Sequence, residues 1–419
     1  MDPDPYRMSI QYNKKLGASF LGGLSSIQSA WHRYRGVVGI FFFSQFLFVL
    51  GVGIGWKMLP AAYASVSADD QEFGLLVSSH FRWDALHYIT LARDGYRSPS
   101  DQGIFKLPAF FPLFPLGVKL STVVLGVRSL FGFAWTAITL DLLFCLGAFL
   151  IIYNLGVKAG LDSSTALRSI LFLAICPFAL FLVVPYTEAL FLFLSSGFFW
   201  FVFKQKWISA GIMAGLLSAT RLNGILFSIL LVLKFCHSAK ENGFPLKNWL
   251  RFIPAFVFSI SGLVFYMVYL QTTYSDPFAF LHAQSNWNRD VQIPFVTLWR
   301  GLVYAFDPGR TEFLDQYLIN TLHTIFIVFF IAVMLASRHR WNWLYQVYGW
   351  LLLTISLISP LQGSATMQST ARYMMVFFPI HFTLADWGRT AWVRTTIYSV
   401  FLLLYLFLSA FYGRGFFVG

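Results

Sequence analysis

The chain has 419 residues, of which 57% are hydrophobic and only 11% are charged. Because soluble domains carry about 25% charged residues, this composition excludes a water-exposed globular protein and predicts an integral membrane protein. The apolar residues recur in continuous runs of about 20, the length of a helix that crosses a hydrocarbon core about 30 Å thick. These runs do not alternate with a period of two, which excludes a membrane β-barrel.

The net charge of +12 does not indicate a nucleic-acid partner. Lys and Arg occur in ones and twos at the ends of apolar runs, and this pattern sets the topology of a membrane protein. The three cysteines show no CxxC or metal-like spacing, so no disulfide framework is predicted.

In chain order, residues 1–36 form a polar N-terminal segment that we place in the cytoplasm, and residues 37–412 form a single transmembrane catalytic module. The first segment is too long and irregular for the start of a cleaved signal peptide. The predicted fold is an all-α bundle with about 11 transmembrane helices, at 37–59, 131–153, 168–185, 188–203, 208–220, 224–236, 251–271, 318–337, 342–359, 372–388 and 393–412.

The apolar segment 110–126 decides the topology. If it lies along the outer membrane surface without crossing, the basic residues of the short loops fall on the side of the N-terminus, as the positive-inside tendency requires. If it crossed, every later basic loop would lie outside. We therefore predict an interfacial helix at 110–126, outer loops at about 60–130 and 272–317, and a short outer tail at 413–419.

The first outer loop contains the stretch of the chain richest in polar residues that could take part in a reaction. On a helix through this loop, Asp84, His87 and Tyr88 share one face, because they are three and four residues apart. A carboxylate at a membrane surface can accept the proton of an attacking hydroxyl. The alternative is that Asp84 only caps a surface helix or forms a salt bridge with Arg82 or Arg93.

Several strings in this loop and beyond it resemble a known family. The first loop contains Arg82-Trp83-Asp84-Ala85-Leu86-His87-Tyr88, then Ala92-Arg93-Asp94-Gly95-Tyr96, then Ala109-Phe110-Phe111-Pro112-Leu113-Phe114-Pro115. Later strings are Pro185-Tyr186-Thr187-Glu188-Ala189-Leu190, Thr220-Arg221-Leu222-Asn223-Gly224, and Ala371-Arg372-Tyr373 followed by Phe378-Pro379. Together they resemble the PIG-V family, polytopic mannosyltransferases of the GT-C class. The tract 276–284 with Trp287 is more similar to the bacterial members.

The resemblance implies a reaction and a site. In that family the Trp-Asp pair of the first outer loop is taken as the active site, so the implied catalytic residues are Trp83 and Asp84. The implied reaction is an inverting transfer of mannose from a polyprenyl-phosphate-mannose donor, of the dolichyl-phosphate-mannose type, to a lipid-linked glycan on the non-cytoplasmic face. The family's activity is an α-1,6 transfer in GPI-anchor biosynthesis. One carboxylate suffices because the leaving group is already a phosphate, unlike in glycoside hydrolysis.

The phosphate of such a donor needs cationic support, and a guanidinium offers a permanently charged, bidentate fork. Arg372, beside Tyr373, and Arg221 lie at the outer ends of predicted spans and are the candidates for binding the donor phosphate or the substrate. The alternative for each arginine is a side chain that extends to the membrane surface and anchors a helix.

Three further polar residues are singled out. Glu188 begins a predicted helix, so it either holds the sugar or acceptor or is simply a carboxylate stabilised by the helix N-terminus. His87 either orients Asp84, binds the acceptor or is structural. Asp141 lies inside a span and, if charged, should face the bundle interior, where it could pair with a basic residue that the sequence does not identify.

The second outer loop mixes aromatic and hydrogen-bonding residues. We interpret most of them as a membrane-interface belt, although a carbohydrate site would have a similar composition. They are His282, Gln284, Asn286, Trp287, Arg289 and Asp290. No metal site and no required cofactor are predicted, and a divalent cation has no supporting ligand cluster.

Two hypotheses of function follow. The first is a glycosyltransferase, and the second is a transporter or flippase of lipid-linked sugars, which the lack of a clear internal repeat weakens. The predicted partners are a polyprenyl-phosphate sugar donor, a lipid-linked acceptor and membrane lipids, with no nucleic acid and no identified protein partner. A bacterial protein of this kind would lie in the plasma membrane, and a eukaryotic one in the endoplasmic reticulum membrane.

Overall fold

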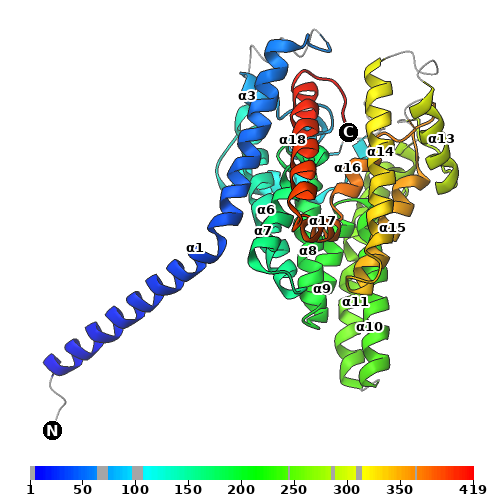
Figure 1. Cartoon of the computed structure of the whole chain (residues 1–419). Helices are drawn as coiled ribbons and strands as arrows, with labels where there is room; N and C mark the ends of the chain where they lie inside the picture. The colour runs from blue at the N-terminus through cyan, green and yellow to red at the C-terminus, as the bar shows by residue number, and fades with distance from the viewer. Residues whose placement is uncertain are drawn as a thin grey trace.

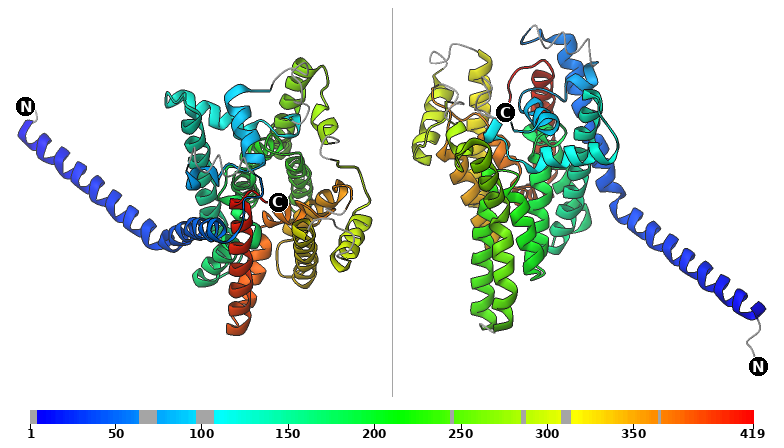
Figure 2. Two further views of the ribbon diagram at one scale, coloured as in Figure 1. Left: turned by 90° about the horizontal axis from the view of Figure 1, so that it is seen from above. Right: turned by 180° about the vertical axis from the view of Figure 1, so that it is seen from behind.

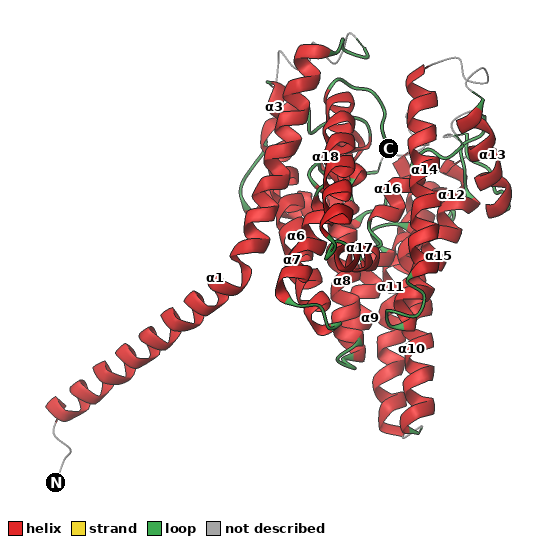
Figure 3. Ribbon diagram, in the orientation of Figure 1, coloured by secondary structure: helices red, strands yellow, loops and turns green. Residues whose placement is uncertain are grey.

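In the computed structural model the chain forms a bundle of helices from which the first half of α1 extends (Figures 1 and 2). The structure describes residues 5–63, 74–96, 107–243, 246–284, 288–307, 314–363 and 366–419. Within these ranges the regular elements are helices, and the one β-type pairing is an isolated antiparallel bridge between Arg289 and Leu361 (Figure 3). The all-α fold predicted from composition is confirmed.

The helices begin with a long element and are interrupted by short 3-10 turns, labelled η. In order they are α1 (Pro5–Met58), α3 (Leu75–Ser78), α4 (Asp84–Asp94), η1 (Leu107–Ala109), α5 (Leu113–Val124), α6 (Leu130–Lys158), α7 (Ser163–Ala174), η2 (Pro177–Leu182), α8 (Glu188–Val202), α9 (Trp207–Ser218), η3 (Leu222–Ile225), α10 (Leu226–Asn242), α11 (Leu246–Tyr274), α12 (Ala279–His282), α13 (Pro294–Phe306), α14 (Leu314–Ala336), α15 (Trp343–Ile358), α16 (Thr370–Met375), α17 (Pro379–Trp387) and α18 (Ala391–Gly413).

Several of these helices are long and apolar enough to cross a membrane. In the part of the chain that the structure describes there are six: Gln28–Met58, Leu130–Lys158, Leu222–Glu241, Trp249–Tyr274, Gln316–Ala336 and Ala391–Gly413. Shorter apolar helices accompany them: Leu113–Val124, Ser163–Ala174, Glu188–Val202, Trp207–Ser218 and Trp343–Ile358. The protein is a multi-pass integral membrane protein, and the number of eleven spans remains a prediction.

Two of the predicted spans are not continuous helices. The span predicted at 168–185 is divided into α7 and η2, and the span predicted at 372–388 is divided into α16 and α17. In each case a proline, Pro177 or Pro379, begins the second element, because a residue without an N–H fits the first turn of a helix but not its interior. Both breaks are buried within the protein, where irregular backbone is tolerated at membrane depth.

Helices α9 and α11 pack backbone against backbone. A side-chain carbon added to Gly211 would lie 2.1 Å from the carbonyl oxygen of Ala255, and one added to Gly215 would lie 2.2 Å from that of Phe258. On α11, Gly262 approaches the Gly215 carbonyl in the same way. Small residues four positions apart allow such an approach, which drives helix association where lipid removes the hydrophobic force. This packing fixes the end of α9 that leads into the site described below.

Helix α5 occupies most of the predicted interfacial segment. Its 12 residues span about 18 Å, less than the hydrocarbon core of about 30 Å, so it does not cross a membrane by itself. Phe114 and Val118 face the bundle, whereas Leu116, Leu120 and Val124 are exposed. The exposed apolar face fits a helix that lies along the membrane surface.

The loops gather at two ends of the bundle. At one end, Asp162 before α7 pairs with Arg389 before α18 at 2.6 Å, and Arg340 before α15 pairs with Asp386 at 2.6 Å. Elements of both predicted outer loops, including α3 and α13, lie toward the other end (Figures 1 and 2). The described elements of the two long loops are therefore separated in space from these ion-paired short loops, and the membrane topology stays a prediction.

The C-terminal residues turn back toward the bundle after α18 (Figure 1). Val418 is buried, and the ring of Phe417 packs edge-on against that of Trp83 with centroids 5.1 Å apart. The segment predicted as a short outer tail at 413–419 thus forms part of the wall around Trp83.

Candidate active site

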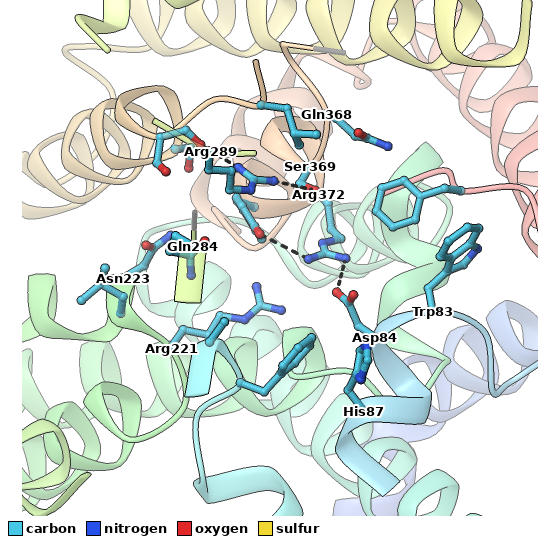
Figure 4. A pocket seen from close by; sticks show the side chains of 18 of the residues that line it. Trp83, Asp84, His87, Arg221, Asn223, Gln284, Arg289, Gln368, Ser369 and Arg372 are labelled. Atoms are coloured by element: carbon cyan, nitrogen blue, oxygen red, sulfur yellow. Dashed lines mark hydrogen bonds and ion pairs between the residues drawn. The ribbon is translucent and has the colours of Figure 1, made fainter. Parts of the chain in front are cut away.

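A cavity of about 1100 Å³ lies where α4, the turn after α9, α16 and the two long loops meet (Figure 4). Most of the residues predicted for the site line it: Trp83, Asp84, His87, Arg221, Arg372 and Tyr373. Glu188 does not line it and is fully buried behind Arg221 and Arg372. The fold therefore brings all seven predicted residues to one place, although they come from four distant parts of the sequence.

Asp84 is the first residue of α4, and the helix predicted through this loop is confirmed. The buried face of α4 includes Tyr88 and Leu91, which pack into the core. His87 lines the cavity on the same helix as Asp84, and its ring lies 4.8 Å from that of Phe110 between centroids. The helix thus presents a carboxylate and an imidazole to the cavity together.

Trp83 precedes α4 in an unusual backbone conformation, with φ 56° and ψ −119°. A non-glycine residue held at positive φ costs about 1–3 kcal/mol, and such strain persists only where the surrounding structure enforces it. Here the carbonyl of Arg82 accepts hydrogen bonds from the hydroxyls of Tyr186 and Tyr412, both at 3.1 Å. These two bonds fix the turn that aims Asp84 into the cavity.

Asp84 pairs with a distant arginine. Its Oδ2 lies 3.0 Å from Nη1 of Arg372, with side chains 19% and 5% exposed. The local alternative of a salt bridge with Arg93 does not apply, since Arg93 pairs with Asp94 and the ion pair of Asp84 joins it to a residue 288 positions away. Oδ1 of Asp84 receives no hydrogen bond from any described side chain or backbone group. One carboxylate oxygen is therefore anchored and the other remains available to a ligand.

Glu188 links the two predicted arginines. Its Oε1 lies 3.0 Å from Nε of Arg372 and 2.5 Å from Nη2 of Arg221, and the carboxylate is 0% exposed. Nε of Arg221 also donates to Oγ1 of Thr187 at 2.5 Å. Charges at this depth are stable only when paired and hydrogen-bonded. Both arginines therefore turn inward, and the alternative of side chains that extend to the membrane surface is wrong.

Tyr88 ties α4 to the start of α8. Its hydroxyl lies 3.3 Å from Oγ1 of Thr187, and burial raises the pKa of Tyr88 above its ordinary value, so the hydroxyl stays protonated. In the turn before α4, burial lowers the pKa of His80 to about 4, and its Nδ1 lies 2.7 Å from the carbonyl of Leu76. The neutral imidazole is thus structural.

Tyr373 lies between the two arginines. The guanidinium carbons of Arg372 and Arg221 are 5.0 and 5.4 Å from its ring centroid, within the range of cation–π attraction. Its hydroxyl accepts a hydrogen bond from Nη2 of Arg372 at 3.3 Å. The ring holds the two guanidinium groups in place along the wall of the cavity.

The structure adds a residue that the sequence assigned elsewhere. Arg289, interpreted as part of an interface belt, lines the cavity, together with His282, Gln284 and Asp290 of the same loop. Asn286 and Trp287 lie outside the described residues. The belt interpretation is wrong for Arg289, because a bridge to Leu361 holds its backbone and its Nη2 lies 3.4 Å from Oγ of Ser369, the residue before α16. No local spacing in the sequence signals this, since the bridge joins segments more than 70 residues apart.

Asp141 faces the bundle interior, as predicted, and is fully buried on α6. Its two carboxylate oxygens have no hydrogen-bond partner among the described groups, and no basic residue pairs with it there. The described residues also contain no group of three or more His, Cys, Asp or Glu side chains arranged to hold a metal ion.

Curated proteins with similar sequences are mannosyltransferases. GPI alpha-1,6-mannosyltransferase 2 of Mus musculus is 31% identical over 171 residues, which make up 40% of this chain and 33% of that protein. The protein of the same name from Cricetulus griseus is 28% identical over 171 residues, again 40% and 33% of the two chains. The similarity thus spans about a third of the length of these relatives. No family model matches the chain.

Solved structures with a similar arrangement of helices come from Archaeoglobus fulgidus. Its oligosaccharyltransferase tethered to an acceptor peptide gives a TM-score of 0.47 at 11% identity, covering 93% of this chain and 56% of that one. The oligosaccharyltransferase AglB with an inhibitory peptide and a dolichol-phosphate gives 0.45 at 11%, covering 93% and 57%. This likeness is weak, and no conclusion about this chain rests on it. The curated relatives, in contrast, confirm the resemblance carried by the motifs: in sequence, this protein is similar to the PIG-V mannosyltransferases.

Proposed function

We propose that this protein is an inverting mannosyltransferase of the GT-C type. It moves mannose from a polyprenyl-phosphate-mannose donor to a lipid-linked glycan acceptor. The observation that carries the proposal is Asp84, a carboxylate with one anchored and one available oxygen in a cavity of about 1100 Å³. Similarity to GPI alpha-1,6-mannosyltransferase 2 over part of the chain supports the choice of sugar.

The proposed step is a single displacement. Oδ1 of Asp84 accepts the proton of the acceptor hydroxyl as that oxygen attacks the anomeric carbon. The bond from the anomeric carbon to the phosphate oxygen breaks on the opposite face, and the polyprenyl phosphate leaves with the bonding electrons. Arg372 positions the carboxylate through the 3.0 Å ion pair. The configuration at the anomeric carbon inverts, and no second carboxylate is needed.

The other residues take supporting roles. Glu188 is 0% exposed, which favours a positioning role for Arg221 and Arg372 over contact with the sugar. His87 lines the cavity one helical turn after Asp84, where it can hydrogen-bond an acceptor hydroxyl. Trp83 shapes the wall of the cavity through its strained backbone and its contact with Phe417.

The reaction requires the cavity to face the non-cytoplasmic side, in the plasma membrane of a bacterium or the endoplasmic reticulum of a eukaryote. In a background without native cysteines, Ser275→Cys near the cavity end should react with an impermeant thiol reagent from outside. Lys204→Cys in the short loop before α9 should not react. The reverse pattern of labelling would invert the topology and remove the basis of the proposal.

The decisive test is transfer of labelled mannose from polyprenyl-phosphate-mannose by the purified protein in lipid. Asp84→Asn should lower the rate by about 100-fold or more while the protein remains folded at the assay temperature, because loss of a general base costs 10²–10⁴-fold. Asp94→Asn on the same helix, whose carboxylate pairs with Arg93, is the matched control and should retain activity.

Undiminished transfer by Asp84→Asn would refute the role of Asp84 as base. If the wild-type protein transfers no mannose but moves a lipid-linked sugar across the bilayer of proteoliposomes, the transporter hypothesis replaces the enzyme.

A further inference from the structure

Three guanidinium groups line the cavity, and they differ in how their charge is balanced. Arg372 and Arg221 share the carboxylate of Glu188, and Arg372 also pairs with Asp84. Arg289 makes no ion pair with any residue that the structure describes, and the exposed carboxylate of Asp290 next to it in the chain does not pair with it. Arg289 therefore brings an unbalanced positive charge to the wall of the cavity.

Arg289 is nevertheless held in place by neutral groups. Nη1 donates to the carbonyl oxygen of Ser359 at 2.6 Å, and Nη2 lies 3.4 Å from Oγ of Ser369. The backbone on either side is fixed by the bridge to Leu361 and by the N–H of Gln292, which donates to the carbonyl of Ile358 at 2.8 Å. Of the five guanidinium N–H groups, two donate to described residues and three have no partner among them. The side chain is oriented but not neutralised, as a built anion site requires.

Ser369 supports this reading of Arg289. It precedes α16 with φ 71° and ψ −13°, a left-handed conformation that a serine adopts only under constraint. The hydroxyl of Ser369 is thereby brought next to Arg289, three residues before Arg372 in the chain. The turn that carries Arg372 and the strand-like segment that carries Arg289 thus form one connected wall.

The position of Arg289 suits a leaving group. Figure 4 shows Asp84, Trp83 and His87 on one side of the cavity, Arg289 and Gln284 on another, and Arg372 between them. In an inverting displacement the base and the leaving group act on opposite faces of the anomeric carbon. Arg372 contacts the base itself at 3.0 Å, so it lies on the side of the attacking hydroxyl. Figure 4 places Arg289 across the cavity from Asp84, on the side where the leaving group would lie.

We propose that Arg289 binds the phosphate of the polyprenyl-phosphate donor, in place of Arg372 and Arg221, which the sequence suggested for that role. The ligand class is a phosphate ester on a lipid carrier. Arg372 and Arg221 instead balance and position Asp84 and Glu188. This proposal rests on the proposed function, because it assigns the leaving-group side of the same site.

The test is a comparison of two probes, polyprenyl phosphate and the unphosphorylated polyprenol, binding to the full-length protein in detergent. Wild type should prefer the phosphorylated probe. Arg289→Gln should lower affinity for polyprenyl phosphate about tenfold or more and leave affinity for polyprenol unchanged, because a hydrogen bond to a charged group contributes about 1.5–3 kcal/mol. The affinity of Arg289→Lys for polyprenyl phosphate should lie between those of the wild type and Arg289→Gln, since lysine keeps the charge but loses the bidentate guanidinium. Arg300→Gln is the matched control, because Arg300 is exposed on α13 and does not line the cavity.

An equal loss of affinity for both probes would show that Arg289 only holds the loops together, and it would overturn the proposal. Loss of phosphate preference in Arg221→Gln, with preference retained in Arg289→Gln, would overturn it as well. Inorganic phosphate is added as a competitor, at the same excess over polyprenyl phosphate, to the wild-type protein and to Arg289→Gln. A site for the lipid carrier should keep polyprenyl phosphate bound to the wild type in this excess, whereas displacement by inorganic phosphate would indicate a general anion site.

Mannose transfer by the wild-type protein is measured in parallel. Arg289-dependent phosphate binding without transfer would leave the anion site standing and remove the proposed function. Mannose transfer together with phosphate binding that does not depend on Arg289 would support the proposed function and refute the anion site at Arg289.

Discussion

Charged side chains form two clusters in this protein, and the clusters differ in burial. The inner cluster lines or underlies the cavity and consists of Asp84, Glu188, Arg221 and Arg372. The loop cluster joins the short basic loops at the other end and consists of Asp162, Arg340, Asp386 and Arg389. In the inner cluster Glu188 is 0% and Arg372 5% exposed, whereas in the loop cluster Arg389 is 52% and Asp162 47% exposed.

The two clusters have different physical meanings. Exposed ion pairs contribute about 0–1 kcal/mol, so the loop cluster adds little to stability. Buried pairs cost desolvation that their attraction repays only with good geometry, and apolar residues of similar size would often be as stable. The inner cluster is therefore not explained by stability. Its place beside the cavity is explained if its charges position the reacting groups.

The largest effect is expected for Glu188→Gln, which keeps the shape of the side chain but removes its charge. Arg372 would then keep only Asp84, and Arg221 would lose the carboxylate it pairs with; breaking a buried pair costs about 3–5 kcal/mol. The thermal unfolding midpoint of the detergent-solubilised protein should fall clearly, and mannose transfer should fall with it. If the midpoint stayed at the wild-type value, burial would not distinguish the two clusters.

A smaller effect is expected for Asp162→Ala in the loop cluster. Asp162 caps α7 by accepting from the backbone N–H of Thr165 at 3.0 Å, and loss of such a cap costs about 1 kcal/mol. Hydrogen bonds from Ser164 and Thr165 hold the pKa of Asp162 below its ordinary value. The cap therefore stabilises the fold above about pH 4 and loses its effect as the pH falls through the lowered pKa.

The pH dependence of the Asp162→Ala difference provides the check. The gap in unfolding midpoint between wild type and variant should be constant from neutral pH to about pH 5 and should shrink in more acidic buffer. A gap that widens on acidification would contradict the assignment of Asp162 as an ionised cap.

The smallest effect is expected for Arg389→Gln, which removes the exposed partner of Asp162 and Asp386. Exposed pairs are screened by water and salt, so the unfolding midpoint and the transfer rate should both match wild type. A fall in unfolding midpoint comparable to that of Glu188→Gln would show that the loop cluster contributes as much to stability as the inner cluster, and the contrast between the two would be lost.

The sequence alone determined the features that depend on composition and local pattern. Its apolar runs required a helical membrane protein, and the spacing of Asp84, His87 and Tyr88 placed them on one helix, because hydropathy and helical periodicity act over a few turns. The motif around Trp83 and Asp84 also singled out two residues that line the cavity. Predicted spans failed at Pro177 and Pro379, since hydropathy cannot distinguish one long apolar helix from two buried pieces.

The tertiary structure alone decided which charges meet. The partner of Asp84 is Arg372, 288 residues away, and the location of Arg289 depends on a bridge to Leu361. Such pairings follow from the packing of distant helices and loops, including the glycine contacts of α9 with α11, and they leave no period or spacing in the chain. The sequence therefore named Asp84, Arg221 and Arg372, whereas the fold added Arg289 to the cavity wall and determined which arginines pair with carboxylates.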